Sequence, residues 1–174
     1  MIVYDHYPNG SLERWLFGIG ALPWTWRLKL VKDIAQGLSF LHSKQLAHGN
    51  LKASSVFLDV NYRPVLGDYG LDFFLPGSGR GSKGDVFGFG MLVLETVAGR
   101  KEEGLLGFAR EMFEKGEIGK VVDERMGDRV NSEEAVRILK IGLSCTASES
   151  GRRPCMEEVV QCLASSSHSR PIVL

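Results

Sequence analysis

Residues 85–97 read DVFGFGMLVLETV, and this stretch decides the fold. It is apolar on nearly every side, and a helix with that pattern is normally buried all round. We therefore predict a buried central helix, with Asp85 near its positively polarised start and Gly99 at its end. Such a helix must be surrounded by other elements, so the flanking sequence should supply amphipathic ones.

The flanking sequence does predict several amphipathic helices. In residues 25–42, apolar side chains recur at helical spacing. Further helices are predicted over 105–115, 132–145 and 156–163, the second of them beginning at Ser132 with Glu133 and Glu134 in its first turn. A short helix over 12–17 is predicted to be capped by Ser11.

Strand signals are few. Residues 56–58 and 65–66 flank turn-forming residues 61–64 and predict one small hairpin laid against the helices. Residues 2–4 are also strand-like, but nothing precedes them for pairing, and this hints at a missing N-terminal part. Together, the predicted helices and the single hairpin indicate a mainly α fold.

Composition excludes several classes of protein. The 174 residues suggest one domain, and 21 basic residues balance 21 acidic ones, so no global field attracts nucleic acid or an anionic membrane. Cys145, Cys155 and Cys162 lack the short paired spacing of a zinc site or a disulfide framework. No signal peptide and no apolar run of about 20 residues is present.

Two short segments have the spacing of a phosphoryl-transfer site. HGNLKASS runs from His48 to Ser55, and DYG follows from Asp68 to Gly70. Protein kinases carry H-R-D-L-x-x-x-N in the catalytic loop and D-F-G about a dozen residues later. The surrounding text also resembles a kinase: IVYDHYPNGSL its hinge, DIAQGLSFLHS the helix before the catalytic loop, KGDVFGFGMLVLETVAGRK the central helix and GLSCTASESGRRPCMEEVVQCL the closing helices.

The chain thus resembles plant receptor-like protein kinases, especially leucine-rich-repeat members with H-G-N and D-Y-G variants. The resemblance covers the large C-terminal lobe only. It implies a protein-kinase-like lobe over 1–165, truncated at the hinge, without the small lobe and with a shortened activation segment at 71–84. Residues 166–174 are expected to form a flexible tail.

The resemblance also assigns roles to individual residues. Asn50 stands at the position of the catalytic base, Lys52 at that of the lysine that neutralises the transferred phosphate, and Ser55 and Asp68 at the two magnesium positions. ATP would meet the gatekeeper Tyr4, the hinge residues Asp5 to Tyr7, and Phe57 beneath the base. Structural roles fall to His48, Tyr69, Asp85 and Arg153. Asp85 should accept N–H groups from around His48 and Gly49.

Several of these positions depart from the chemistry of an active kinase. An amide such as Asn50 cannot take the substrate proton, and the neutral Ser55 hydroxyl is a weak magnesium ligand. Gly49 replaces the arginine that would pair with a phosphorylated activation loop. No A-P-E motif occurs in residues 71–84, so Arg153 lacks its usual glutamate; if buried it needs another acid, and otherwise it is solvated.

Three interpretations remain open. The leading one is a catalytically impaired pseudokinase that acts by protein–protein interaction in receptor-like signalling, with weak or lost binding of ATP and Mg²⁺. The alternative is an ATP-binding serine/threonine kinase whose N-terminal lobe lies outside this chain, and the third is a non-functional gene fragment. The expected partner is a protein, with another receptor-like kinase as a candidate. The expected location is the cytoplasmic side, at the plasma membrane only as part of a longer receptor.

Overall fold

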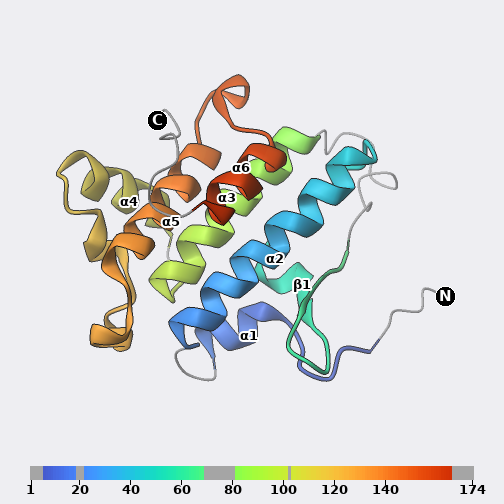
Figure 1. The fold of residues 1–174 in the computed structure, drawn as a ribbon, viewed down its shortest axis with the longest axis horizontal. Coiled ribbons are helices and arrows are strands. Elements are labelled where there is room, and N and C mark those ends of the chain that lie inside the picture. Colours follow the sequence, from blue (N-terminus) through green and yellow to red (C-terminus); the bar gives the residue numbers. More distant parts are fainter. Residues whose placement is uncertain (1–5, 19–21, 69–80, 102, 166–174) are drawn as a thin grey trace.

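The computed structural model describes residues 6–18, 22–68, 81–101 and 103–165. The described part is mostly helical, with a single two-stranded sheet (Figure 1). Its α-helices are α1 (Leu12–Phe17), α2 (Trp24–Ser43), α3 (Ser82–Ala98), α4 (Leu105–Glu114), α5 (Ser132–Cys145) and α6 (Met156–Ala164). Short 3₁₀ turns lie at Ala53–Ser55 (η1), Ile118–Val121 (η3), Glu124–Arg129 (η4) and Ser150–Arg152 (η5). No helix in this described part is long and apolar enough to cross a bilayer.

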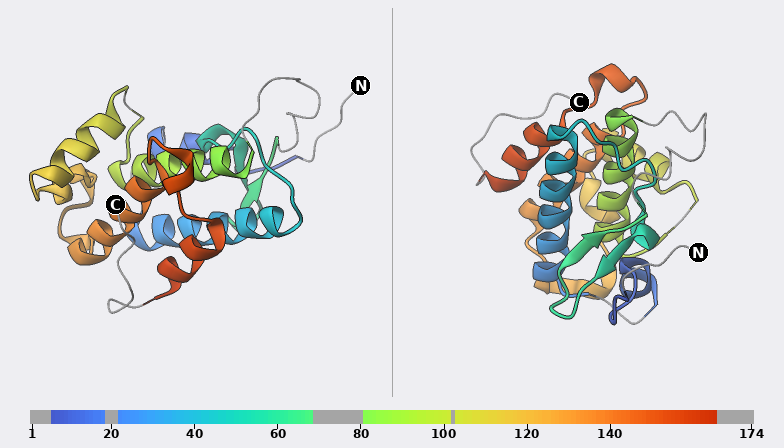
Figure 2. Two further views of the ribbon diagram at one scale, coloured as in Figure 1. Left: turned by 90° about the horizontal axis from the view of Figure 1, so that it is seen from above. Right: turned by 90° about the vertical axis from the view of Figure 1, so that its right-hand side faces the viewer.

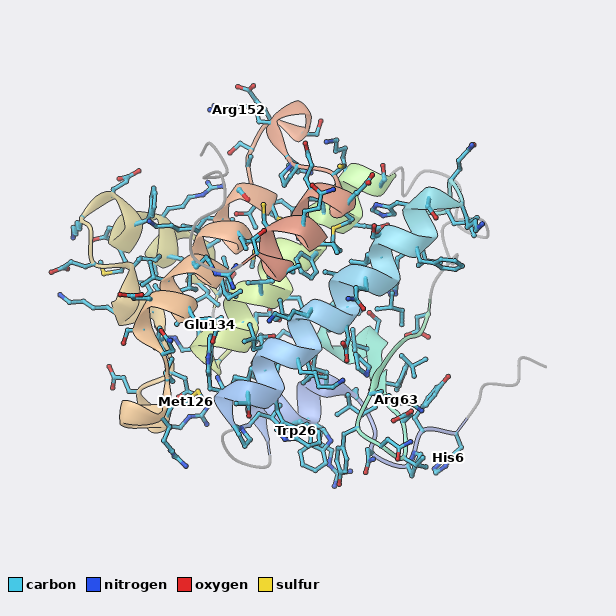
Figure 3. All side chains as sticks on the ribbon, in the orientation of Figure 1. His6, Trp26, Arg63, Met126, Glu134 and Arg152 are labelled. Atoms are coloured by element: carbon cyan, nitrogen blue, oxygen red, sulfur yellow. The ribbon has the colours of Figure 1, made fainter. Side chains whose placement is uncertain are left out.

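Helix α3 is the centre of the fold, as its sequence predicts. Phe89, Leu92 and Val93 are fully buried, and Gly99 ends the helix in the left-handed conformation. Helix α5 packs on one side of α3 and α2 on another, while α6 lies against α2 (Figures 1 and 2). The α3–α5 contact needs a glycine, because a Cβ on Gly90 would lie 2.7 Å from the carbonyl oxygen of Gly142.

The hairpin consists of β1 (Val56–Leu58) and β2 (Pro64–Leu66), paired antiparallel with Val56 opposite Leu66. The segment before α1 runs beside β1: Leu58 donates its N–H to the carbonyl of Gly10, and Ser11 forms a bridge with Phe57. This segment is thereby attached to the strand that follows η1.

The predicted capping of α1 by the Ser11 side chain is wrong. Ser11 precedes α1 but makes no side-chain cap hydrogen bond; its extended backbone pairs with Phe57 instead. Helix α5 begins at Ser132 as predicted, yet the capping side chain belongs to Asn131, which accepts the N–H of Glu134 at 3.1 Å. The strand predicted over 2–4 and the tail over 166–174 lie outside the described residues.

A buried ion pair that the sequence analysis did not anticipate joins three parts of the fold. Arg27 of α2 is fully buried and donates to the carboxylate of Asp123, between η3 and η4, at 2.6 Å. It also donates to the carbonyls of Leu22 and Thr96, at 2.9 and 2.8 Å. Arg27 occupies the apolar face of α2, where a charged residue is unusual.

Candidate functional site

The loop that begins at His48 is held in place by Asp85. The buried carboxylate of Asp85 accepts the N–H of His48 at 2.7 Å and that of Gly49 at 2.8 Å. Both predicted hydrogen bonds are therefore present. A third contact, from His42 Nε2 at 2.9 Å, was not predicted, although His42 falls in the last turn of α2 immediately before the loop. Three contacts give this buried acid the hydrogen-bond donors that it needs.

The His48 ring is packed inside the protein. Burial lowers the pKa of His48. The nearby Asp85 carboxylate opposes this effect, and Asp68 and the Gly67 carbonyl oppose it more weakly. Nδ1 accepts the N–H of Asn50 at 3.3 Å, so the proton of a neutral ring belongs on Nε2. Among the described residues Nε2 has no hydrogen-bond partner.

Ser55 closes the loop on itself. Its fully buried hydroxyl donates to the carbonyl of Asn50 at 2.8 Å and accepts the N–H of Lys52 at 3.0 Å. A hydroxyl has one proton to donate, so this residue already serves the loop backbone. Asn50 itself is half-buried, and its carboxamide bonds no residue in the described part of the chain.

Asp68 lies beside this loop at the end of β2. The N–H of Gly67 bonds to the carbonyl of Ser55 at 2.9 Å, which brings the next residue, Asp68, close to the loop. Asp68 is half-buried and has a φ of 56°, a left-handed conformation that Asp adopts more readily than most residues. Lys52 is exposed. Within the described ranges, no group of three or more His, Cys, Asp or Glu side chains could hold a metal ion.

The residues predicted to contact an adenine base are only partly described. Tyr4, Asp5 and Tyr69 lie outside the described residues. Tyr7 and Phe57 are brought together: their rings stack with centroids 5.3 Å apart and an interplanar angle of 18°. Phe57 also lies close to Gly67, a contact that the sequence did not predict. A Cβ on Gly67 would lie 2.5 Å from the Phe57 ring. One face of Phe57 is therefore covered by Tyr7, and its edge contacts Gly67.

Arg153 matches neither of the two alternatives expected from the sequence, which were a buried ion pair with an acidic residue and a solvated side chain. It is half-buried and donates to the carbonyls of Ala147 at 2.8 Å and Lys83 at 2.9 Å. Its guanidinium also lies over the Phe87 ring, 4.9 Å from the centroid. Backbone carbonyls and an aromatic face thus satisfy this cation, and no carboxylate of the described residues contacts it.

Comparison with known proteins supports the kinase resemblance. Residues 1–78 match the family model described as protein tyrosine and serine/threonine kinase. The chain is 32% identical to the L-type lectin-domain containing receptor kinase S.1 of Arabidopsis thaliana, over 95% of this chain and 31% of the relative. It is also 32% identical to the probable LRR receptor-like serine/threonine-protein kinase IRK of the same plant, over 94% of this chain and 21% of the relative. The chain therefore spans about a third or less of these curated relatives.

A solved structure agrees with this result. The pseudokinase domain of BIR2, described as an immune regulator of the RLK/Pelle family, matches with a TM-score of 0.84 and 26% identity. The match covers 92% of this chain and 58% of that one. The fold and these matches define a protein-kinase-like domain, of which the chain corresponds to the C-terminal lobe. More narrowly, its sequence is similar to the kinase domains of plant receptor-like kinases.

The matches do not select one type of receptor. Lectin-domain and leucine-rich-repeat kinases match at the same identity, so the leucine-rich-repeat type predicted from the H-G-N and D-Y-G variants stays a prediction. The alignment with the lectin-domain kinase extends over 203 positions, more than the 174 residues of this chain. The relative therefore carries insertions that this chain lacks.

Proposed function

We propose that this chain is a pseudokinase-type domain that acts by binding another protein and does not transfer phosphate. The observation that carries the proposal is the pair of substitutions in the loop held by Asp85. Asn50 stands at the base position and has no basic lone pair at neutral pH. Ser55 stands at a magnesium position, and its buried hydroxyl is already bonded to the loop backbone.

The residues present do not fit Mg-ATP as they would in an active kinase. Of the two predicted magnesium positions, only Asp68 offers a carboxylate, and Mg²⁺ favours several oxygen ligands in octahedral geometry. Phe57, the predicted surface beneath the base, is covered on one face by Tyr7. We therefore derive no catalytic step through ATP or magnesium, and we expect binding of Mg-ATP to be weak or absent.

The comparisons support the proposal. The matching solved structure is itself described as a pseudokinase and an immune regulator, which favours a role in signalling through protein contacts. The longer alignment of the lectin-domain kinase is consistent with a shortened activation segment at 71–84, which would remove part of a peptide-docking platform. On this proposal, residues 1–165 form the kinase-like lobe, and the partner is a protein such as another receptor-like kinase on the cytoplasmic side of the membrane.

A serine/threonine kinase remains the second candidate. Asp68 and the exposed Lys52 keep the family residue types, and IRK is described as a probable serine/threonine-protein kinase. In that case, an N-terminal lobe outside this chain would complete the ATP site.

A phosphotransfer assay on this chain tests the proposal. The chain is incubated with labelled ATP, Mg²⁺ or Mn²⁺ and a generic protein substrate, beside an Asp68→Ala variant that removes the remaining metal-type carboxylate. We expect equal background incorporation from both, and the same from Asn50→Asp, because restoring the base does not restore the metal ligand. Incorporation by the unmodified chain above that of Asp68→Ala would refute the proposal. Calorimetry should detect no Mg-ATP affinity in the micromolar range.

A further inference from the structure

A groove of about 850 Å³ lies beside the residues that precede the loop of the candidate site, with Ala47 in its wall. Its walls come from the end of α2, the following loop, the start of α3 and the start of α6, which meet in the upper part of Figure 1. Phe40 and Leu46 line it from the first two, Lys83 and Val86 from α3, and Met156 from α6. No role proposed above uses these residues.

This groove displays apolar side chains to solvent. The described residues include four exposed large hydrophobic side chains, at Trp26, Phe40, Leu46 and Val60. Two of the four line this one groove, Phe40 with 62% of its surface exposed and Leu46 with 42%. Val86 and Met156 add buried apolar surface to the wall. A gathering of exposed apolar groups at a concave site is typical of an interaction surface.

Positive charge accompanies the apolar surface. The ammonium of Lys83 donates to the backbone carbonyl of Arg153, whose guanidinium donates in return to the carbonyl of Lys83. Neither cation forms an ion pair with a carboxylate in the described part of the chain. Helix α3 also begins here without a side-chain cap. The partial positive charge of its N-terminus therefore adds to the charges of the two cations. On the α2 side, Lys44 lies 5.7 Å from the centroid of the Phe40 ring.

The negative groups nearby compensate for only part of this charge. Asp85 already accepts from His42, His48 and Gly49. Glu158 accepts the N–H of Cys155 at 2.8 Å. That hydrogen bond is the main cause of the lowered pKa of Glu158, and Lys83 makes a smaller contribution. Among the described residues that line the groove, Glu157 is the one acidic side chain. The wall formed by α3 therefore favours an added carboxylate.

We propose that this groove docks a segment of a partner protein that carries one or two large apolar side chains beside an aspartate or glutamate. The apolar side chains would cover Phe40 and Leu46, and the carboxylate would lie at the first turn of α3 beside Lys83. The inference rests on the proposed protein-binding function and adds to it the place and chemistry of the contact.

The test begins with an unbiased probe. A random dodecapeptide library displayed on phage is selected on the whole 174-residue chain, and enriched peptides are synthesised and titrated by fluorescence anisotropy. We expect enriched peptides to combine a large apolar residue with Asp or Glu. Phe40→Ser should weaken their binding about tenfold, as loss of an interface aromatic often does. Val60→Ser is the matched control, because Val60 is 70% exposed and is not among the groove residues.

A double-mutant cycle tests the carboxylate. Changing the acidic residue of the peptide to its amide should cost about tenfold in affinity on the unmodified chain, and about threefold or less on Lys83→Gln. Thermal melts confirm that each variant is folded. Overturning results would be no enriched peptide family, no preference for an acid, or equal loss on Val60→Ser. A chain ending at Ser165 that binds about tenfold more tightly would assign the groove to residues 166–174 instead. If the chain transferred phosphate and the groove still bound its peptides, the proposed function would be refuted and the groove proposal would stand.

Discussion

The carboxylate of Asp85 lies 2.7 Å from the backbone nitrogen of His48, 37 positions earlier in the chain. This single contact joins the central helix to the loop that carries every substituted catalytic position described above. Because Asp85 also accepts the N–H of Gly49, the first two residues of the loop are held through their backbone groups. The shape of the loop can therefore persist after its catalytic residue types have changed.

Asp85→Ala should destabilise the chain more than Asp68→Ala. The first change leaves the N–H groups of His48 and Gly49 without acceptors, at a cost of roughly 1–3 kcal/mol in the free energy of unfolding. The second removes a half-buried side chain that accepts no hydrogen bond from the described residues. Urea unfolding of both variants measures the difference. If Asp68→Ala proves the more damaging, Asp68 has a structural role that its contacts do not reveal.

Loss of Arg27 should be more costly than loss of Arg125, although both guanidinium groups bind Asp123. Arg27→Met leaves a buried carboxylate without one partner and also leaves the carbonyls of Leu22 and Thr96 unsatisfied, so we expect a loss of about 3 kcal/mol. Arg125 is half-exposed, and Arg125→Ala should cost about 1 kcal/mol or less. Denaturant melts of the two variants provide the comparison, and equal losses would contradict it.

The same carboxylate should make the stability depend on pH in acid. Burial alone would raise the pKa of Asp123, but hydrogen bonds from Arg125 and Arg27 outweigh it and lower the pKa from 3.8 to about 2. A lowered pKa in the folded state means that the contribution is complete above the unfolded value and is lost as the pH falls through the folded value. About 2 kcal/mol should therefore disappear between roughly pH 4.5 and pH 2.

Asp123→Asn is the matched variant for this dependence. It cannot titrate, so its free energy of unfolding should lose correspondingly less between pH 5 and pH 2, whatever its stability at pH 7. Parallel acid dependence in the two proteins would show that another group is responsible.

The helices and the hairpin could be predicted closely because their signals are local. The apolar pattern of α3 and the spacing in α2 fixed both elements to within a few residues, since burial of one face dictates the period. The partners of polar side chains could not be predicted in the same way. Arg27 meets Asp123 from 96 positions away, and Arg153 meets Lys83 from 70. Such contacts depend on how helices cross, which a local pattern does not contain.

The candidate site was predictable to a similar extent. The resemblance placed the N–H groups of His48 and Gly49 on Asp85, and these hydrogen bonds are present. It did not reveal that Ser55 bonds the loop backbone, because a hydroxyl in place of an amide changes which groups it can reach. It also did not reveal the contact of Gly67 with Phe57, which depends on the close approach of the chain after β2.

That contact gives the last prediction. Gly67→Ala would place a Cβ 2.5 Å from the Phe57 ring, so either the ring or the backbone after β2 must move. We expect a loss of about 1–3 kcal/mol in the free energy of unfolding, the usual cost of overpacking. In a Phe57→Ala background the same change should cost about 1 kcal/mol less, because the ring that it strikes is gone. Urea melts of the two single variants and the double variant measure this coupling. Additive losses would show that Gly67 is required for its backbone alone and that Phe57 is free to move away.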